Sequence, residues 1–104
     1  MEGGEVQLMQ SRSLAELART LPEWTPHVVH DCGVQKLKLV NATVKPFDFD
    51  VHDHAETLIS VGGAYAIATP QGEIAIPEGT SFTVPAGLKH RPANREQCAI
   101  LVLS

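Results

Sequence analysis

Residues 50–63, DVHDHAETLISVGG, place two histidines and a glutamate at every second position, as His52, His54 and Glu56. Side chains alternate along a strand, so Asp50, His52 and His54 are predicted to share one face. If His54 closes one strand and Glu56 opens its hairpin partner, two imidazoles and a carboxylate meet at one point. Such a set of nitrogen and oxygen ligands suits Fe(II), Mn, Ni, Cu or Zn. A solvated polar hairpin tip has the same spacing, so this stretch alone leaves both interpretations open.

A third histidine follows a turn that should set its direction. Residues 81–84 have the composition of a strand, the turn Pro85-Ala86-Gly87 follows, and His90 comes three residues after the glycine. Proline presets φ in a turn, and glycine tolerates the positive φ or the close approach that bends the chain. We therefore expect His90 to be directed back along the sheet, towards residues on a neighbouring strand.

These two stretches resemble the two motifs of the cupin family. The second motif, Gly-x5-Pro-x-Gly-x2-His-x3-Asn, is matched at every fixed position, by Gly79, Pro85, Gly87, His90 and Asn94. The first motif, Gly-x5-His-x-His-x3–4-Glu-x6-Gly, is matched in residue type by His52, His54, Glu56 and Gly63. There are two departures. Pro46 stands in place of the leading glycine, and a single residue separates His54 from Glu56 where the motif has three or four.

The resemblance implies a double-sheet β-barrel of the jelly-roll type, also called a double-stranded β-helix, with a divalent metal inside it. Carried over residue by residue, it implies His52, His54, Glu56 and His90 as the metal ligands. Glu56 is also the candidate catalytic residue, because a carboxylate that leaves the metal can accept a proton. The identity of the metal stays open among Fe, Mn, Ni, Zn and Cu.

The short spacing between His54 and Glu56 leaves two alternatives at this site. In the first, the Glu56 carboxylate points to the mouth of the barrel instead of the metal. In the second, Asp50 and His52 occupy the two histidine places, since three residues then separate His52 from Glu56, and His54 is a surface residue. His27 and His30 lie three apart in a predicted strand and face opposite sides, so they are left out of the site.

The elements expected to carry these residues are mostly strands. Ser13-Leu14-Ala15-Glu16 has the form of a capping box and predicts one short helix near residues 13–20. Short apolar runs separated by glycine and proline predict an all-β fold, an antiparallel sandwich or small barrel. The strands are predicted near residues 27–32, 35–40, 42–52, 56–61, 64–69, 72–76, 80–84 and 97–103.

Size and composition indicate a soluble globular protein with a single domain, residues 1–104. Residues 1–10 are expected to be a loose arm, and the barrel is expected at about residues 35–103. The formal net charge of −4, with scattered Lys and Arg, argues against nucleic acid or an anionic membrane surface as a partner. No apolar stretch is long enough to span a bilayer and no signal peptide is visible, so a cytoplasmic location is expected. Cys32 and Cys98 are then expected to be free thiols packed as small hydrophobes.

Two functions are compatible with a metal site in such a barrel. The first is a metal-dependent enzyme acting on a small molecule, and the resemblance implies dioxygenase, isomerase or decarboxylase chemistry. The alternative is a non-catalytic module that binds a small molecule, with or without metal, as a sensor. Whether the chain is an enzyme stays open at this point. The resemblance also implies a homodimer, with Trp24, Phe47, Phe49 and Val51 as a candidate apolar interface.

Overall fold

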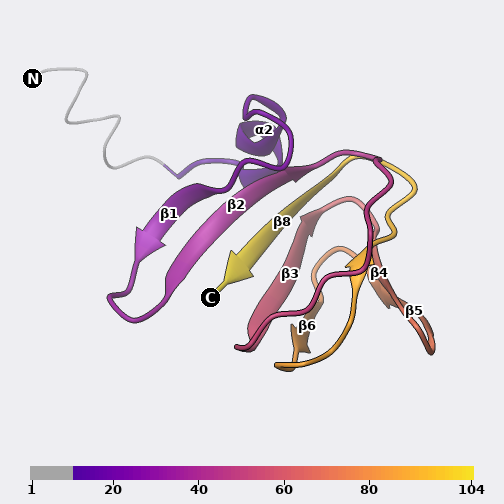
Figure 1. The fold of residues 1–104 in the computed structure, drawn as a ribbon. Helices are drawn as coiled ribbons and strands as arrows, with labels where there is room; N and C mark the ends of the chain where they lie inside the picture. The colour runs from indigo at the N-terminus through magenta and orange to yellow at the C-terminus, as the bar shows by residue number, and fades with distance from the viewer. Residues whose placement is uncertain (1–10) are drawn as a thin grey trace, which may run out of the picture.

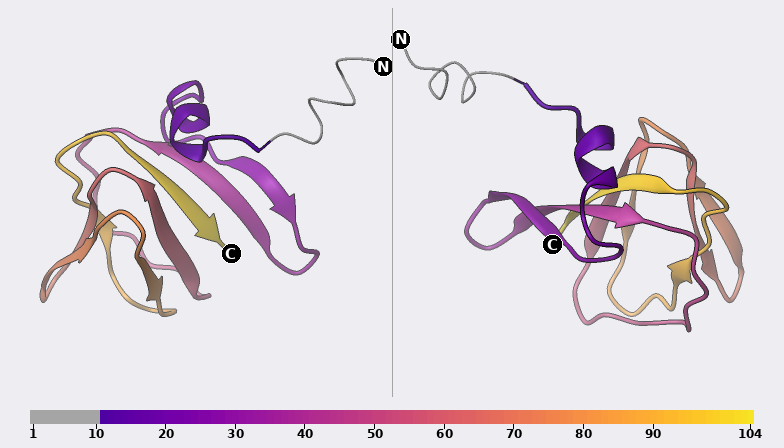
Figure 2. Two further views of the ribbon diagram at one scale, coloured as in Figure 1. Left: turned by 180° about the vertical axis from the view of Figure 1, so that it is seen from behind. Right: turned by 90° about the horizontal axis from the view of Figure 1, so that it is seen from above.

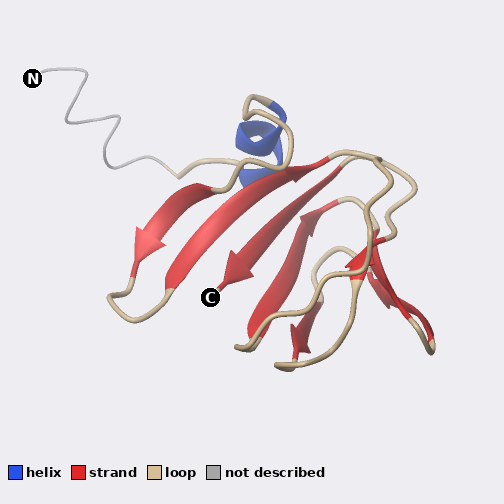
Figure 3. Ribbon diagram, in the orientation of Figure 1, coloured by secondary structure: helices blue, strands red, loops and turns tan. Residues whose placement is uncertain are grey.

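The computed structural model describes residues 11–104, and the expected arm at residues 1–10 lies outside them. The described chain is mostly β-structure, arranged as two antiparallel sheets with one short helix (Figure 1, Figure 3). The predicted all-β class with a short N-terminal helix is therefore confirmed.

The larger sheet has five strands in the order β1-β2-β8-β3-β6. Its strands are β1 (His27–Asp31), β2 (Lys36–Ala42), β8 (Cys98–Leu103), β3 (Glu56–Gly62) and β6 (Ser81–Val84). The smaller sheet has the order β5-β4-β7 and consists of β5 (Gly72–Ile76), β4 (Tyr65–Thr69) and β7 (Arg91–Pro92). Because β8 lies between β2 and β3, the C-terminal strand joins two earlier parts of the chain into one sheet (Figure 1).

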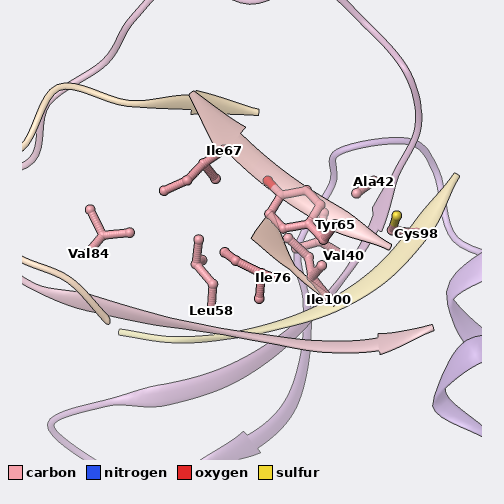
Figure 4. Close-up of a cluster of buried hydrophobic side chains, with 9 residues drawn as sticks. All are labelled: Val40, Ala42, Leu58, Tyr65, Ile67, Ile76, Val84, Cys98 and Ile100. Carbon is pink, nitrogen blue, oxygen red and sulfur yellow. The ribbon is translucent and has the colours of Figure 1, made fainter. Parts of the chain in front are cut away.

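The main hydrophobic core lies between the two sheets. Along β2, Val40 and Ala42 belong to this inner core, whereas Leu39 between them faces the other side, as strand alternation requires. The inner cluster is drawn in Figure 4 and consists of Val40, Ala42, Leu58, Tyr65, Ile67, Ile76, Val84, Cys98 and Ile100. Removal of these side chains from water is the main force that holds the sheets face to face.

Helix α2 (Leu14–Arg19) covers the outer side of the larger sheet (Figure 2). The Oγ of Ser13 accepts a 3.2 Å hydrogen bond from the amide of Glu16, which confirms the predicted N-terminal cap. Ala18 is fully buried and packs against Leu39 and other apolar side chains of β2 and β8. Within residues 11–104, no helix has both the length and the apolarity that crossing a membrane requires.

The predicted strand at residues 42–52 is wrong. β2 ends at Ala42, and residues 43–55 contain only an isolated antiparallel bridge between Asp50 and His90. Pro46 has no N–H to donate to a ladder, and β2 already has β1 and β8 on its two sides. The segment therefore leaves the larger sheet (Figure 1), and its Asp50 pairs with His90. β7, which was not predicted, follows directly after His90.

Both cysteines are free thiols, as expected, but only Cys98 is buried. Cys32 is exposed in the turn between β1 and β2, so its predicted packing as a small hydrophobe is wrong. All residues of β1 are exposed, because β1 is the edge strand of the larger sheet. His27 and His30 therefore lie on the surface, away from the candidate site, as expected.

Candidate metal centre

Three of the four predicted ligands, His52, Glu56 and His90, lie together at the start of β3. One ligand atom from each falls within 4.8 Å of the others. The Nε2 atom of His90 is 3.6 Å from Oε1 of Glu56, and the Nε2 atom of His52 is 4.0 Å from the same oxygen. Two ligands that are each about 2.1 Å from one ion are separated by at most ~4.2 Å. Both distances are therefore compatible with a shared metal ion.

His90 is positioned by a turn and by main-chain pairing. Gly87 closes the turn with a φ of 85°, and the amide of Leu88 donates to the carbonyl of Pro85 at 3.3 Å. His90 and Asp50 then exchange two main-chain hydrogen bonds, of 2.9 and 2.8 Å. The imidazole is buried, with 9% of its side chain exposed. The turn thus brings the histidine to a neighbouring segment, as the Pro-Ala-Gly pattern led us to expect.

Glu56 and His52 approach from the other side. Glu56 is the first residue of β3, lies opposite Val84 of β6 in register, and has 16% of its side chain exposed. His52 comes from the irregular segment at residues 43–55, and its carbonyl accepts a 2.9 Å hydrogen bond from the amide of Gly87. The ligand-bearing segment is therefore held against the turn through its main chain.

The tautomer of His90 determines whether its Nε2 atom has a lone pair that can bind a metal. Nδ1 lies 2.9 Å from the carbonyl oxygen of Leu88, and a carbonyl only accepts, so Nδ1 carries the hydrogen. In the neutral ring Nε2 then presents a lone pair towards the Glu56 carboxylate. Two acceptors that face each other repel unless a cation or a proton lies between them. The donor chemistry of this group therefore fits a bound cation, and a carbonyl that orients a metal-binding histidine is the usual supporting contact.

His54, the fourth predicted ligand, lies outside this group. Its side chain is more than half exposed, and its Nδ1 is 3.0 Å from Oδ1 of Asp53. This contact with His54 lowers the pKa of the Asp53 carboxyl below its usual value. The chain bends at both residues, so the strand alternation that would carry His54 to the side of His52 is lost. The two rings remain neighbours, with centroids 5.6 Å apart.

Asp50 lies beside His52 at the rim of the cavity, with 72% of its side chain exposed. Its Oδ2 atom is 3.9 Å from Nε2 of His52, and it lines the same cavity as the three grouped residues. Its Oδ1 accepts a hydrogen bond from the amide of Val51. This arrangement corresponds to the alternative register, in which Asp50 and His52 take the two histidine places. Asp50 stands outside the group of three possible ligands, and it is the candidate fourth ligand because its carboxylate lies near His52 at the cavity rim.

The site opens on a cavity of about 330 Å³ whose lining comes from both sheets. Most of its wall is apolar, with Val40, Leu58, Ile67, Ile100 and Val102 as its aliphatic part. Tyr65 lies in this wall and is 4% exposed. Burial raises the pKa of its phenol well above the usual value, and the negative charges of Cys98 and Glu56 act in the same direction. The cavity therefore combines an apolar body with the polar group of candidate metal ligands at its edge.

Two residues of the expected dimer interface belong to this cavity instead. Trp24 and Phe47 both line it and pack edge to face, with ring centroids 4.9 Å apart. Phe49 and Val51 remain about half exposed, and the guanidinium of Arg91 lies 4.7 Å from the centre of the Phe49 ring. The homodimer itself stays a prediction.

Asn94 has a structural role and does not contact the candidate metal site. Asn94, the last residue of the second motif, donates from Nδ2 to the carbonyls of Ala42 and Glu96, at 3.0 and 2.9 Å, and so stabilises the fold.

Lys38 lines the cavity and was missed by sequence reasoning. The available signal was its spacing of two from Val40 and four from Ala42, which places all three on the inner face of β2.

No protein-family model matches this sequence, and no curated protein matches it. Several solved structures do. A cupin-2 domain protein from Shewanella frigidimarina is 26% identical, with a TM-score of 0.78 over 86% of this chain and 87% of that chain. A protein from Neisseria meningitidis is 22% identical, with a TM-score of 0.74 over 90% of this chain and 97% of that chain. A hydroquinone 1,2-dioxygenase in complex with Fe³⁺ is 18% identical, with a TM-score of 0.70 over 85% of this chain but only 29% of that chain.

Proposed function

Because this chain is a protein of the cupin superfamily with the jelly-roll fold, we propose that it binds a divalent metal ion and uses it on a small molecule in the barrel cavity. The proposal rests first on one observation. A lone pair of His90 and the carboxylate of Glu56 face each other at 3.6 Å, at the edge of a cavity of about 330 Å³. A cation between them, bound also by His52, removes the repulsion.

The residues of this site would have distinct tasks. When bound, a divalent metal supplies a Lewis acid or a centre that activates oxygen. His52 and His90 provide neutral nitrogen ligands, and Glu56 provides a carboxylate that can also accept a proton from the substrate. Asp50 offers a further carboxylate, 3.9 Å from Nε2 of His52. The apolar wall excludes water and packs against the body of the substrate.

The donor set favours some metals and reactions over others. Two imidazoles and one carboxylate are the ligands of many non-haem Fe(II) oxygenases, and carboxylates also suit Mn. A dioxygenase is therefore the reaction class we place first, before an isomerase or a decarboxylase. The structurally similar hydroquinone dioxygenase is 18% identical, so it shares the fold and carries no information on the substrate of this chain.

A non-catalytic binding or sensor protein is the second candidate. Its support is the wall of the cavity, which is mostly apolar and lined by Trp24, Phe47 and Tyr65 in addition to aliphatic side chains. Such a wall can hold a small molecule by burial alone. This function predicts saturable binding of a small molecule by metal-free protein and no turnover when metal is added.

Metal content tests the proposal directly. The chain is purified without chelators or a histidine tag, and bound Fe, Mn, Ni, Cu and Zn are quantified in the wild type, in His90→Ala and in His30→Ala. His30 is an exposed histidine of β1 and serves as the matched control. We expect a stoichiometric metal in the wild type and in His30→Ala and its loss in His90→Ala. A wild type that stays metal-free after reconstitution with each ion would contradict the proposal.

A further inference from the structure

Lys38 lies on the inward face of β2, between Lys36 at the exposed start of the strand and Val40 in the core. Val40 and Ala42, two and four residues further along β2, belong to the inner hydrophobic core. Lys38 pairs in register with Val102 of β8, which pairs in turn with Leu58 of β3, and all three line the cavity. The lysine therefore extends into the same space as the candidate metal ligands.

The ammonium of Lys38 keeps hydrogen-bonding capacity in this position. Its Nζ donates a 2.8 Å hydrogen bond to Oγ of Ser104, which two main-chain hydrogen bonds to Lys36 hold beside β2. Among residues 11–104, no carboxylate lies within ion-pair distance of it. An ammonium has three donors, so two of them have no partner within the described part of the chain.

The distance from Lys38 to the metal corner suits a small organic molecule. Lys38 lies two strands away from Leu58, and Glu56 lies two residues before Leu58 on β3. Strands spaced about 4.8 Å apart and residues spaced about 3.3 Å along a strand put the backbones of Lys38 and Glu56 roughly 12 Å apart. Both side chains extend into the cavity and shorten that gap. The wall between them is apolar, formed by Leu58, Ile100 and Val102.

With a divalent cation bound, the charges that line the cavity also favour an anion. Lys38 and Arg91 are opposed by the carboxylates of Asp48, Asp50 and Glu56, so a bound divalent cation leaves the lining with a net positive charge. Arg91 is already engaged, since its Nη1 donates to the carbonyl of Phe47 at 3.4 Å and its guanidinium lies over Phe49. Of the two cations, Lys38 is the one that pairs in register with Val102, beside the apolar wall formed by Leu58, Ile100 and Val102.

We propose that the ligand of this cavity is a small organic acid whose carboxylate pairs with the Lys38 ammonium. Its apolar body lies against Leu58, Ile100 and Val102, and its other end reaches His52, Glu56 and His90. The orientation of that other end rests on the proposed metal function, whereas the pairing with Lys38 does not depend on a metal. A single ammonium without a helix N-terminus or an arginine fork suits a carboxylate better than a phosphate, which usually has several partners.

Fluorescence of Trp24 can report on binding, because it lines the cavity and is the only tryptophan of the chain. The titrants are benzoate, its neutral isostere benzamide, and phenyl phosphate, each added to metal-free and metal-loaded protein. The variants are Lys38→Met and, as the matched control, Lys36→Met, which removes the same charge from an exposed position of β2. Metal content and thermal unfolding are measured for every sample.

We expect benzoate to bind more tightly than benzamide to the wild type and to Lys36→Met. The benzoate affinity of Lys38→Met should be about 10- to 100-fold lower than that of the wild type, which is the contribution of a hydrogen bond to a charged group. Lys38→Met should keep the wild-type metal content. Equal binding of benzoate and benzamide, or unchanged benzoate affinity in Lys38→Met, would overturn the proposal and leave Lys38 as a lysine that only covers apolar surface. Tighter binding of phenyl phosphate than of benzoate would overturn the carboxylate class. A wild type that takes up no metal on reconstitution but still distinguishes benzoate from benzamide through Lys38 would contradict the metal function and leave the Lys38 pairing standing.

Discussion

The Nε2 atom of His90 lies 3.6 Å from Oε1 of Glu56, although the two residues are far apart in the sequence. His90 precedes β7 of the smaller sheet, and Glu56 opens β3 of the larger one. The loop before β7 therefore meets the start of β3 at this pair, and the hydrogen bond from Nδ1 to Leu88 leaves Nε2 of His90 facing the carboxylate. This geometry leads to the first prediction.

Glu56→Gln should weaken metal binding by at least about tenfold. Even the removal of a group that only orients a metal ligand typically lowers metal affinity about 10- to 100-fold. The amide removes the negative charge and keeps the shape of the side chain. Titration with Mn²⁺ or Zn²⁺ followed by calorimetry measures the change. Glu73→Gln is the matched control, since Glu73 pairs with Arg95 away from the cavity. Equal affinities in the two variants would remove Glu56 from the ligand set.

Asp50→Asn and His54→Ala should separate the two possible registers of the first motif. Asp50 lies at the rim of the cavity, 3.9 Å from His52, whereas His54 does not line the cavity and contacts Asp53. We expect Asp50→Asn to weaken metal binding by about tenfold and His54→Ala to leave it unchanged within error. The opposite order, measured in the same calorimetric titration, would show that His54 turns inward when metal binds.

Asn94→Ala should lower the free energy of unfolding by about 1–3 kcal/mol, the cost of leaving buried acceptors without a donor. Its side-chain amide ties the end of β2 to the residues before β8, through the carbonyls of Ala42 and Glu96. Urea unfolding measures the change. Metal affinity of the folded variant should equal that of the wild type, because Asn94 does not line the cavity. A loss of metal affinity with unchanged stability would contradict the structural role.

Stability should fall in alkaline solution because of Cys98. Burial raises the pKa of its thiol to about 11, from a usual value of 9.0, and the charge of Glu96 adds to the effect. The folded state thus holds the proton more tightly than the unfolded state does. Its contribution to stability is complete below pH 9, falls as pH rises from 9 to about 11, and amounts to about 2–3 kcal/mol in total.

Urea unfolding of the wild type and of Cys98→Ala at pH 7, 9 and 11 tests this linkage. Tyr65 has a raised pKa as well and lowers the stability of both proteins at high pH, so the difference between them is the informative quantity. We expect Cys98→Ala to be destabilised at pH 7 by its lost packing and to lose less stability than the wild type between pH 9 and 11. Parallel losses in the two proteins would show that the Cys98 thiolate is tolerated in the fold.

The sequence was most informative where local rules act. The cap of α2 at Ser13 and the direction of His90 both follow from neighbouring residues, and both are found in the structure. The path of residues 43–55 could not be predicted in this way. Their β-branched and aromatic residues are typical of a strand, but both sides of β2 are occupied by strands from distant parts of the chain. The inward position of Lys38 depends on the same non-local pairing, so it became visible only in three dimensions.

The segment that carries Asp50 and His52 is held in place by main-chain atoms, through the paired hydrogen bonds to His90 and the one from Gly87. Every residue except proline offers the same main-chain donor and acceptor. The path of the chain at the cavity edge is therefore insensitive to which side chains stand at positions 50 and 52. Single substitutions at these two positions can exchange nitrogen for oxygen donors without rebuilding the barrel, so the chemistry of the site can diverge while its architecture stays unchanged.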